Sequence, residues 1–514
     1  MKLPALLLLI VITWCHCDTQ SDMDSYRRQV KEMFQHAYDN YLLHAFPHDE
    51  LAPISCVGVD TWGSFSLTLL DALDTLVVMG NQSEFRRAYQ LALQQHLSFN
   101  IDTNTSVFEA NIRVVGGLLS AHLLSARGGI PVPPGWPCEG PLLSMAESLA
   151  RRLLPAFDTP TGLPYGSVNL RYGVSPGETP LTCTSCCASY IVEFGVLSRL
   201  TGDTVFEDVA LRAIHALWNR RSTIGLVGNH INVLTGEWKA TDFTVGNFVD
   251  SYLEYLVKGG ILLRRPELLE MFHDLYQQAS RYSKLHDWFV SVNMNTGQIS
   301  SPYYYALDAY WPGLLSMVGE LPQAEKSFIK PYSIWRSLGV LPEMFNIADG
   351  KPVAKHEAYH LRPELAESTW YLFRATKNPF YLEVGKAMIH SIQNISRVNC
   401  GYATVKNSLT HVLADRMESY FLAETTKYLY LLFDPDNFLN QQDAITHKHV
   451  EHLHYDARML RSGCTVGSTG YILTTEAHPI DTGIIHCCGM KNKPTQVNTC
   501  NKRPFSSRLQ LSLT

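Results

Sequence analysis

Apolar residues recur along this chain with the spacing of helices, and long stretches of strand-like alternation are scarce. An amphipathic helix is predicted at Ser25–Leu43, with Val30, Met33, Phe34 and Tyr38 on its apolar face. Seven later helices are apolar on almost every side. Their approximate cores are Ser64–Met79, Asn111–Ser125, Tyr190–Thr201, Ser251–Leu263, Ala309–Val318, Leu365–Thr376 and Ser419–Phe433.

Most of these apolar helices are followed by a turn and then by a more polar helix. The predicted second helices are Glu84–His96, Leu142–Leu154, Val205–Arg220, Pro266–Ser283, Gln323–Leu338 and Pro379–Ile395. Such pairs indicate a degenerate helix–helix repeat, and the N-terminal helix is the candidate partner for the seventh apolar helix. Helix pairs stack either as an open solenoid or as a closed ring. Because the first helix of each pair is apolar nearly all round, we predict an all-α fold closed into an α/α toroid.

The last part of the chain has a different pattern. Tyr471–Thr475 and Gly483–Ile485 predict a short strand or β-hairpin, and residues 490–514 read as a polar tail. The Pro/Gly-rich stretches Gly128–Gly140 and Leu170–Thr182 are interpreted as loops within one helical domain, residues 25–485.

Composition and charge limit the cellular locations and binding partners that the protein can have. The net charge is −6 without a basic tract, which gives no support to nucleic-acid binding. Residues 1–17 have the short charged start and apolar run of a signal peptide, and an uncleaved anchor is the alternative. Three glycosylation sequons, at Asn81, Asn104 and Asn394, suit the secretory pathway.

Twelve cysteines fit an oxidising lumen, where the ten beyond Cys15 and Cys17 can form disulfides. Cys183 and Cys186 have CxxC spacing, which also allows a zinc site, although no second ligand pair is nearby in sequence.

Carboxylates recur at the starts of the apolar helices. They are Glu109, Asp250, Glu364, Glu367 and Glu418, with Arg113 and Arg362 close in sequence. One such acid is an ordinary helix-capping residue. In a toroid, however, the first helices of all pairs run the same way, so we expect these five side chains to meet at one mouth.

Carboxylates that meet in a cavity serve either as paired acid and base or as ligands of a hard divalent cation. Glu343 lies in a loop predicted to lead to the same mouth. Thr475 and Glu476 could approach from the other end, and a simple serine/threonine turn before Pro479 is the alternative for them.

Five ordered motifs carry a family resemblance: Phe108-Glu109-Ala-Asn-Ile-Arg113, Asp250-Ser-Tyr-Leu-Glu-Tyr-Leu, Leu361-Arg-Pro-Glu364, Met417-Glu418-Ser and Thr475-Glu476-Ala-His-Pro. Together they resemble the class I α-mannosidases, glycoside hydrolase family 47. The similarity runs from about residue 25 to residue 480. Within the family the chain is most similar to the ER degradation-enhancing α-mannosidase-like group.

The resemblance implies an (α/α)7 barrel with Ca²⁺ at its base and inverting hydrolysis of α1,2-linked mannose. It implies Glu109 as general acid and Glu364 as base, with Asp250 and Glu343 as further active-site carboxylates. Thr475 is implied as the calcium ligand. Glu367, Glu418 and Glu476 are implied to hold calcium-bound waters and sugar hydroxyls, and Arg113 and Arg362 to contact substrate.

The resemblance also implies a Cys56–Cys400 disulfide, the lumen of the endoplasmic reticulum as location, and misfolded glycoproteins with high-mannose N-glycans as substrates. Two local departures from the family pattern concern catalysis: Phe248 before Asp250, and Cys186-Cys187 before Glu193. They leave a mannose-binding receptor with weak or no catalysis as the alternative function, and a helical scaffold without a sugar site as a third. Cys487, Cys488 and Cys500 are expected to pair with each other or with a thioredoxin-like oxidoreductase.

Overall fold

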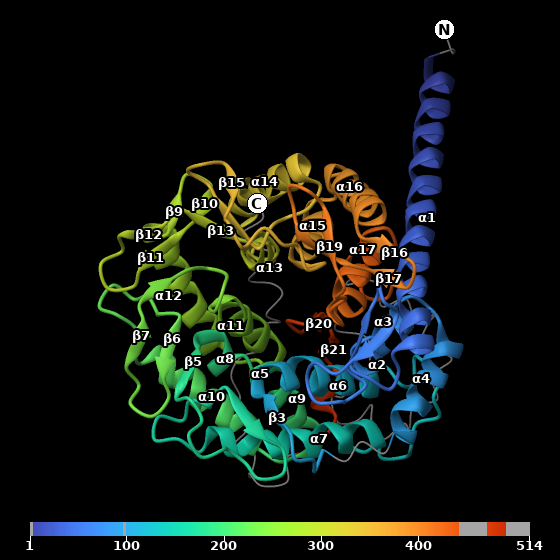
Figure 1. Cartoon of the computed structure of the whole chain (residues 1–514). Helices are drawn as coiled ribbons and strands as arrows, with labels where there is room; N and C mark the ends of the chain where they lie inside the picture. Colours follow the sequence, from blue (N-terminus) through green and yellow to red (C-terminus); the bar gives the residue numbers. More distant parts are fainter. Residues whose placement is uncertain (1–3, 96–98, 442–469, 490–514) are drawn as a thin grey trace, which may run out of the picture.

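The computed structural model describes residues 4–95, 99–441 and 470–489, and its helices form a closed ring with inner and outer layers (Figure 1). The inner segments are α2 (Leu67–Asp71) with α3 (Leu73–Val78), α5 (Val107–Glu109) with η1 (Ala110–Val115) and α6 (Gly116–Leu123), α9 (Ile191–Thr201), α11 (Asp250–Leu262), η3 (Ala306–Tyr310) with α13 (Trp311–Met317), α15 (Glu364–Thr376), and η4 (Phe421–Thr425) with α17 (Thr426–Leu432). The outer helices are α4 (Gln82–Gln94), α7 (Pro141–Leu153), α10 (Val205–Trp218), α12 (Pro266–Tyr282), α14 (Leu321–Leu338) and α16 (Phe380–Ile395). The predicted α/α toroid is therefore confirmed.

The two layers differ in which side chains they bury, as their sequences predict. In α12, Pro266 occupies the first turn and Leu268, Phe272 and Leu275 are buried on one side of the helix. In α11, by contrast, the buried residues include Tyr252, Glu254 and Lys258 on several sides. An inner helix is therefore enclosed all round, and any charged group on it must find a partner inside the protein.

The seventh outer position is occupied by α1 (Pro4–His44), which packs against α17 and α16. This confirms the predicted role of the N-terminal amphipathic helix as the missing partner. In the structure that segment and most of the predicted signal peptide form one helix, which extends beyond the ring in Figure 1.

The first inner helix begins at Leu67 rather than at the predicted Ser64 because the preceding backbone is hydrogen-bonded to Asp49. The Asp49 carboxylate accepts hydrogen bonds from the amides of residues 61–65, at 2.6–3.2 Å. Ser64 and Ser66 consequently adopt left-handed φ angles of 58° and 55°. The loop is fixed by one buried carboxylate.

Two inner helices contain π-helical segments, η1 and η4, both close to predicted site residues. η1 follows Glu109, and η4 follows Glu418 and Tyr420. Single π turns in helices are frequent at functional sites.

Short strands occupy the connections. The two-stranded sheets are β1–β2 (Glu50–Ala52, Val57–Val59), β3–β4 (Asn104–Ser106, Ser167–Asn169), β9–β10 (Lys284–Leu285, Trp288–Phe289), β16–β17 (Arg397–Val398, Gly401–Tyr402), β18–β19 (Thr404–Asn407, Val412–Ala414) and β20–β21 (Tyr471–Leu473, Pro479–Asp481). The three-stranded sheets are β5–β6–β7 (Leu181–Cys183, His230–Asn232, Trp238–Ala240), β8–β11–β12 (Asp242–Phe243, Ser291–Asn293, Ile299–Ser301) and β13–β14–β15 (Tyr303–Tyr305, Met344–Asn346, Lys351–Pro352).

The hairpin β20–β21 lies inside the ring (Figure 1), where it contacts α11 and α6. The prediction that Tyr471–Thr475 starts a hairpin is confirmed, but its proposed partner Gly483–Ile485 is wrong. Pro479–Asp481 is the second strand, and Ile484–His486 forms a 3₁₀ turn. The Thr474–His478 connection allows a tighter hairpin because Ala477 adopts a left-handed φ of 56°.

Three disulfides join two described cysteines each. Cys56 pairs with Cys400, the pairing that the resemblance implied. Cys138 pairs with Cys488, so Cys488 is bonded to a loop of the ring and not to another cysteine near the C-terminus. Cys183 pairs with Cys186, which excludes zinc binding by these two sulfurs in this state. Cys464, Cys500 and the predicted tail 490–514 lie outside the described residues.

Candidate active site

Glu109 stands at the mouth of the ring with its carboxylate held by Arg113. Ser106 caps the short helix α5 by accepting a hydrogen bond from the Glu109 amide. Arg113, four residues on, donates from Nε to Oε2 of Glu109 at 2.7 Å and from its NH1 group to Ser419 at 2.9 Å. Arg113 thus connects the second inner segment to Ser419, which stands just before the seventh.

Arg362 holds a second group of carboxylates. Its guanidinium makes a bidentate contact to Glu343, at 2.6 and 2.9 Å, and lies 3.7 Å from Oε1 of Glu364. Burial raises the pKa of Glu364 to about 7, against the opposing effect of Arg362. A carboxyl group with such a pKa can take up or release a proton near neutral pH.

Tyr420 links the two groups. Its ring centre lies 5.2 Å from the guanidinium carbon of Arg113 and 6.0 Å from that of Arg362. These are cation–π distances. Glu109 and Glu364, from the second and sixth inner segments, therefore belong to one site.

Asp250 begins α11 at the same site. Its Oδ1 accepts hydrogen bonds from the Ser185 hydroxyl at 2.7 Å and from the Ser251 amide at 2.8 Å. Burial raises its pKa to about 6, although these two donors favour the ionised form. Phe248, two residues earlier, has a left-handed φ of 73° and packs against the ring of His230. A bulky residue with positive φ is strained, a feature that concentrates at functional sites.

Glu418 lies among the same charged groups, two residues before Tyr420, and its side chain is 6% exposed. Its carboxylate pairs with Arg416 and lies close to Glu50, whose pKa rises to about 7 through burial and repulsion by Glu418. The next residue, Ser419, donates its amide to Glu50 at 2.8 Å. Glu418 is therefore buried, and its carboxylate lies between Arg416 and the group of charges around Tyr420.

Three more carboxylates form a deeper layer below the mouth. Side-chain exposure falls from 21% for Glu109 and 20% for Glu343 to 11% for Glu367 and 5% for Glu476. Burial raises the pKa of both deep glutamates to about 8. Their positive neighbours are Lys258, 3.9 Å from Glu367, and Arg113, 3.6 Å from Glu476.

The third deep carboxylate, Glu424, was missed by the sequence analysis. It lies within η4, and burial and repulsion by Glu476, Glu364 and Glu367 raise its pKa well above the usual value. Because it faces carboxylates of both groups, Glu424 joins the Glu109 side of the site to the Glu364 side. Its signal in the sequence was an acid in the middle of a helix that is otherwise apolar all round.

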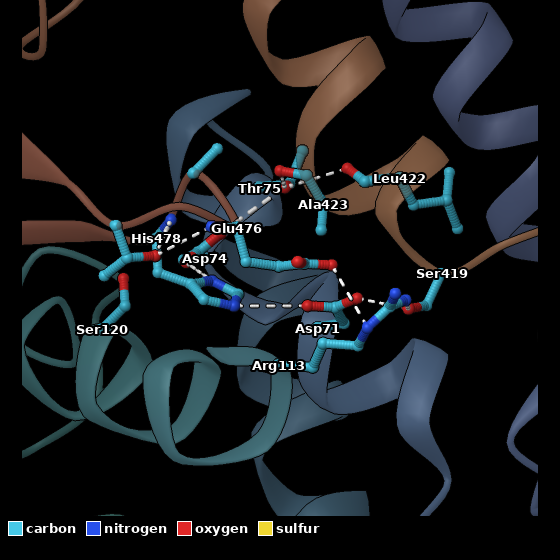
Figure 2. Close-up of polar contacts among 12 residues, drawn as sticks. Asp71, Asp74, Thr75, Arg113, Ser120, Ser419, Leu422, Ala423, Glu476 and His478 are labelled. Atoms are coloured by element: carbon cyan, nitrogen blue, oxygen red, sulfur yellow. Dashed lines mark hydrogen bonds and ion pairs between the residues drawn. The ribbon is translucent and has the colours of Figure 1, made fainter. Parts of the chain in front are cut away.

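A buried charged cluster supports the turn that carries Thr475 and Glu476 (Figure 2). Nδ1 of His478 lies 2.6 Å from Asp74 and its Nε2 lies 3.2 Å from Asp71. Lys427 pairs with Asp74 at 2.6 Å and donates to the carbonyl of Ala477 at 2.8 Å. These four residues, missed from sequence, fix the hairpin connection to the first and last inner segments.

The site also fits a hard cation at Thr475. The Thr475 hydroxyl and carbonyl are oxygen ligands of the kind that Ca²⁺ prefers. Glu476 is the next residue, and it lies close enough to Glu424 to repel it, as Glu367 does. Oε1 of Glu476 is buried without a hydrogen bond. In the described ranges no three His, Cys, Asp or Glu side chains are arranged to bind a metal directly.

The three predicted glycosylation sites stand on three different elements. Asn104 and Asn394 are exposed, in β3 and α16, and Asn81 caps α4. Within the described part of the chain, no helix combines the length and the apolar character needed to span a membrane.

Comparisons with known proteins bear on this geometry. Residues 33–482 match the model of glycosyl hydrolase family 47. The chain is 55% identical over 490 residues to the mouse ER degradation-enhancing alpha-mannosidase-like protein 2, covering 95% of this chain and 83% of that protein. The human protein of the same name is 56% identical over 468 residues, covering 91% and 79%.

A solved structure agrees with the observed fold. The alpha-1,2-mannosidase from Trichoderma reesei superposes with a TM-score of 0.77 at 23% identity, covering 89% of this chain and 99% of that one. The similarity supports the ring architecture predicted from the helix pairs.

Proposed function

The chain belongs to glycosyl hydrolase family 47 and is a mannosidase-type glycosidase, and we propose that its substrate is terminal α1,2-linked mannose of high-mannose N-glycans. One observation carries this proposal. Glu109 and Glu364 come from different inner segments, each beside an arginine, and Tyr420 joins the two arginines. Carboxylates on separate helices can flank a sugar, whereas neighbours on one helix cannot.

Glu109 is proposed as the general acid. The described hydrogen bond from Arg113 reaches Oε2, which leaves Oε1 to carry the proton to the glycosidic oxygen. The hydrogen bond fixes the carboxyl group while the mouth, where Glu109 is one-fifth exposed, admits the glycan.

Glu364 is proposed as the base that takes a proton from the attacking water. Its raised pKa, about 7, makes it a competent base near neutral pH. Inversion at the anomeric carbon requires acid and base on opposite faces of the sugar, roughly 6.5–9.5 Å apart, so that the water fits. Asp250 and Glu343 are proposed to orient the water and the sugar, with Arg113 and Arg362 contacting substrate.

Ca²⁺ is proposed to bind at Thr475, where it would neutralise the deep carboxylates and orient sugar hydroxyls. Waters around it and sugar hydroxyls would be held by Glu367, Glu418, Glu476 and, in addition, Glu424. The burial of three carboxylates that repel one another supports this proposal, since such a group is costly inside a protein unless cations neutralise it.

The proposed setting is the lumen of the endoplasmic reticulum, with misfolded glycoproteins as substrates destined for degradation. The names of the mouse and human relatives and the oxidised cysteine pairs support it. A thioredoxin-like oxidoreductase remains a proposed partner, and residues 1–17 a proposed signal peptide.

The test is to incubate the purified protein with Ca²⁺ and a high-mannose glycoprotein, with and without a thioredoxin-like oxidoreductase, and to count released mannoses by mass spectrometry. We expect stepwise loss of mannose. If the α1,2-linked mannoses are removed from the glycoprotein beforehand, we expect no further loss. No release by the wild-type protein under any of these conditions, with its fold intact, would overturn the proposal.

The second candidate, a mannose-binding receptor with weak catalysis, is favoured by one observation. Phe248 is 40% exposed beside Asp250, where its ring can cover a bound sugar. Glycan binding measured by calorimetry, without mannose release, would support this function over the first.

A further inference from the structure

A serine held by a local disulfide contacts an active-site carboxylate. The short helix α8 (Thr184–Ala188) is capped by Cys183, and the disulfide between Cys183 and Cys186 encloses Ser185. The Ser185 side chain is buried, and its hydroxyl donates to Oδ1 of Asp250 at 2.7 Å. α8 is thus joined to the start of α11 at the mouth of the ring.

Both described donors to the Asp250 carboxylate reach the same oxygen. Besides Ser185, the Ser251 amide donates to Oδ1 at 2.8 Å. Among the described residues no hydrogen bond reaches Oδ2. The two donors therefore fix the rotation of the carboxylate and leave Oδ2 free to face a water or a sugar hydroxyl.

The charged groups around Asp250 determine how much its ionised form depends on the hydrogen bond from Ser185. Glu254, Glu364 and Asp308 repel its negative charge, and Arg362 is its nearby cation. The Tyr310 hydroxyl hydrogen-bonds to the backbone carbonyls of Val245 and Asp250 and not to the Asp250 carboxylate. Ser185 is therefore the side-chain donor that stabilises the ionised form of Asp250.

The position of Ser185 depends on the loop around it. Its amide donates to the carbonyl of Phe248 at 2.8 Å, where the backbone has the strained φ described above. The Cys183 sulfur accepts the amide of Cys186 at 3.0 Å, as a capping residue does. The disulfide spans three positions in sequence, against 344 for Cys56–Cys400. Because the entropic gain from a cross-link grows with loop length, its main effect is local geometry.

We propose that Ser185 is a positioning residue for the Asp250 carboxylate, and that the Cys183–Cys186 disulfide holds Ser185 in that place. Ser185 acts through Asp250 and does not contact the sugar. The inference deepens the proposed hydrolysis and rests on it for its catalytic meaning, whereas the contact itself can be tested without substrate.

The first experiment compares Ser185→Ala, Ser185→Thr and wild type by kcat/KM for mannose release as a function of pH. Ser189→Ala is the matched control, because Ser189 is a buried serine four residues on that donates to the Ser251 hydroxyl and not to Asp250. Loss of the donor raises the pH at which Asp250 ionises. We expect Ser185→Ala to lose about tenfold or more on the acid side and less at pH 8, with Ser185→Thr restoring the wild-type profile.

An unchanged pH dependence in Ser185→Ala, or the same uniform loss in Ser189→Ala, would overturn the positioning role. If Ser185→Ala does not fold, Ser185→Gly provides the same comparison.

The second experiment follows carboxyl protonation by infrared difference titration without substrate, with Asp250→Asn to assign the band. We expect the Asp250 band to titrate at higher pH in Ser185→Ala. This readout decides the contact even if wild type releases no mannose, an outcome that would count against the proposed hydrolysis alone.

The disulfide is tested with Cys183→Ser combined with Cys186→Ala. A serine at 183 keeps an acceptor for the amide of residue 186, so the variant loses the cross-link and keeps the cap. We expect its Asp250 band to shift in the same direction as in Ser185→Ala. A wild-type titration in this variant would overturn the role of the disulfide.

Discussion

Lys427 and Asp74 form a fully buried ion pair, with Nζ of the lysine 2.6 Å from Oδ1 of the aspartate. His478 contacts the other oxygen of Asp74. The pair connects the last inner helix to the first, and through His478 and the Ala477 carbonyl it fixes the turn of Thr475 and Glu476. The closure of the ring and the floor of the site thus depend on the same buried charges.

Replacing Asp74 with Asn is expected to lower the free energy of unfolding by about 3–5 kcal/mol, because two buried cations lose their shared partner. Urea unfolding at neutral pH measures this. Asp24→Asn is the control, since Asp24 pairs with Arg27 while one-third exposed, and it should cost at most about 1 kcal/mol. Similar small costs for both variants would contradict the structural role of the buried pair.

The same cluster predicts a loss of stability at alkaline pH. Asp74 and Asp71 raise the pKa of His478 to about 9, against the effect of burial, from an ordinary value of 6.5. A base with a raised folded pKa contributes stability that is complete below pH 6.5 and is lost as pH rises through 9. The free energy of unfolding of wild type should therefore fall across this window, and that of His478→Gln should fall less. Parallel curves would refute the charged state of His478.

Glu109→Gln is expected to reduce mannose release by at least about 10²-fold without changing the unfolding temperature, because the amide cannot deliver a proton. Mass spectrometry of the glycans and thermal unfolding measure the two effects. Glu147→Gln, on the outer face of α7 and paired with Arg151, provides the control and should release mannose at the wild-type rate. Undiminished release by Glu109→Gln would remove Glu109 from the role of acid.

The pH dependence of mannose release should show Glu364 as a base. Burial raises its pKa to about 7, so it is increasingly protonated, and unable to accept a proton from water, as pH falls below 7. We expect kcat/KM to fall about tenfold per pH unit on that side. Glu364→Gln should be inactive at every pH. If Glu364→Gln is partly active and its kcat/KM still falls at low pH, that fall is caused by another group.

Removal of Ca²⁺ by a chelator should lower both the unfolding temperature and mannose release, since a ligand that binds only the folded state stabilises it by mass action. Thr475→Val should abolish the response of the unfolding temperature to Ca²⁺, and Thr475→Ser, which keeps the hydroxyl, should retain it. A full calcium response in Thr475→Val would place the cation elsewhere.

The local pattern of the chain was enough to predict the ring of helices and the acids at its mouth. Helix periodicity is a property of neighbouring residues, and Glu109, Asp250 and Glu364 stand at or beside helix starts that the pattern marks. The all-round apolar character of the inner helices predicted their enclosure. It did not predict that the first inner helix begins as late as Leu67, because that start depends on the hydrogen bonds of Asp49 to the preceding backbone.

Only the tertiary structure decided which buried charges meet. Asp74 and His478 are 404 positions apart, and Cys138 and Cys488 are 350 apart, so no local pattern pairs them. Glu424 stands inside an apolar helix, and its place among the other carboxylates follows from ring closure. The sequence thus determined the helices, the repeat and the acids at the mouth. The partners of each buried charge were decided by packing, because a charge inside the ring must be neutralised by whichever group the fold brings within reach.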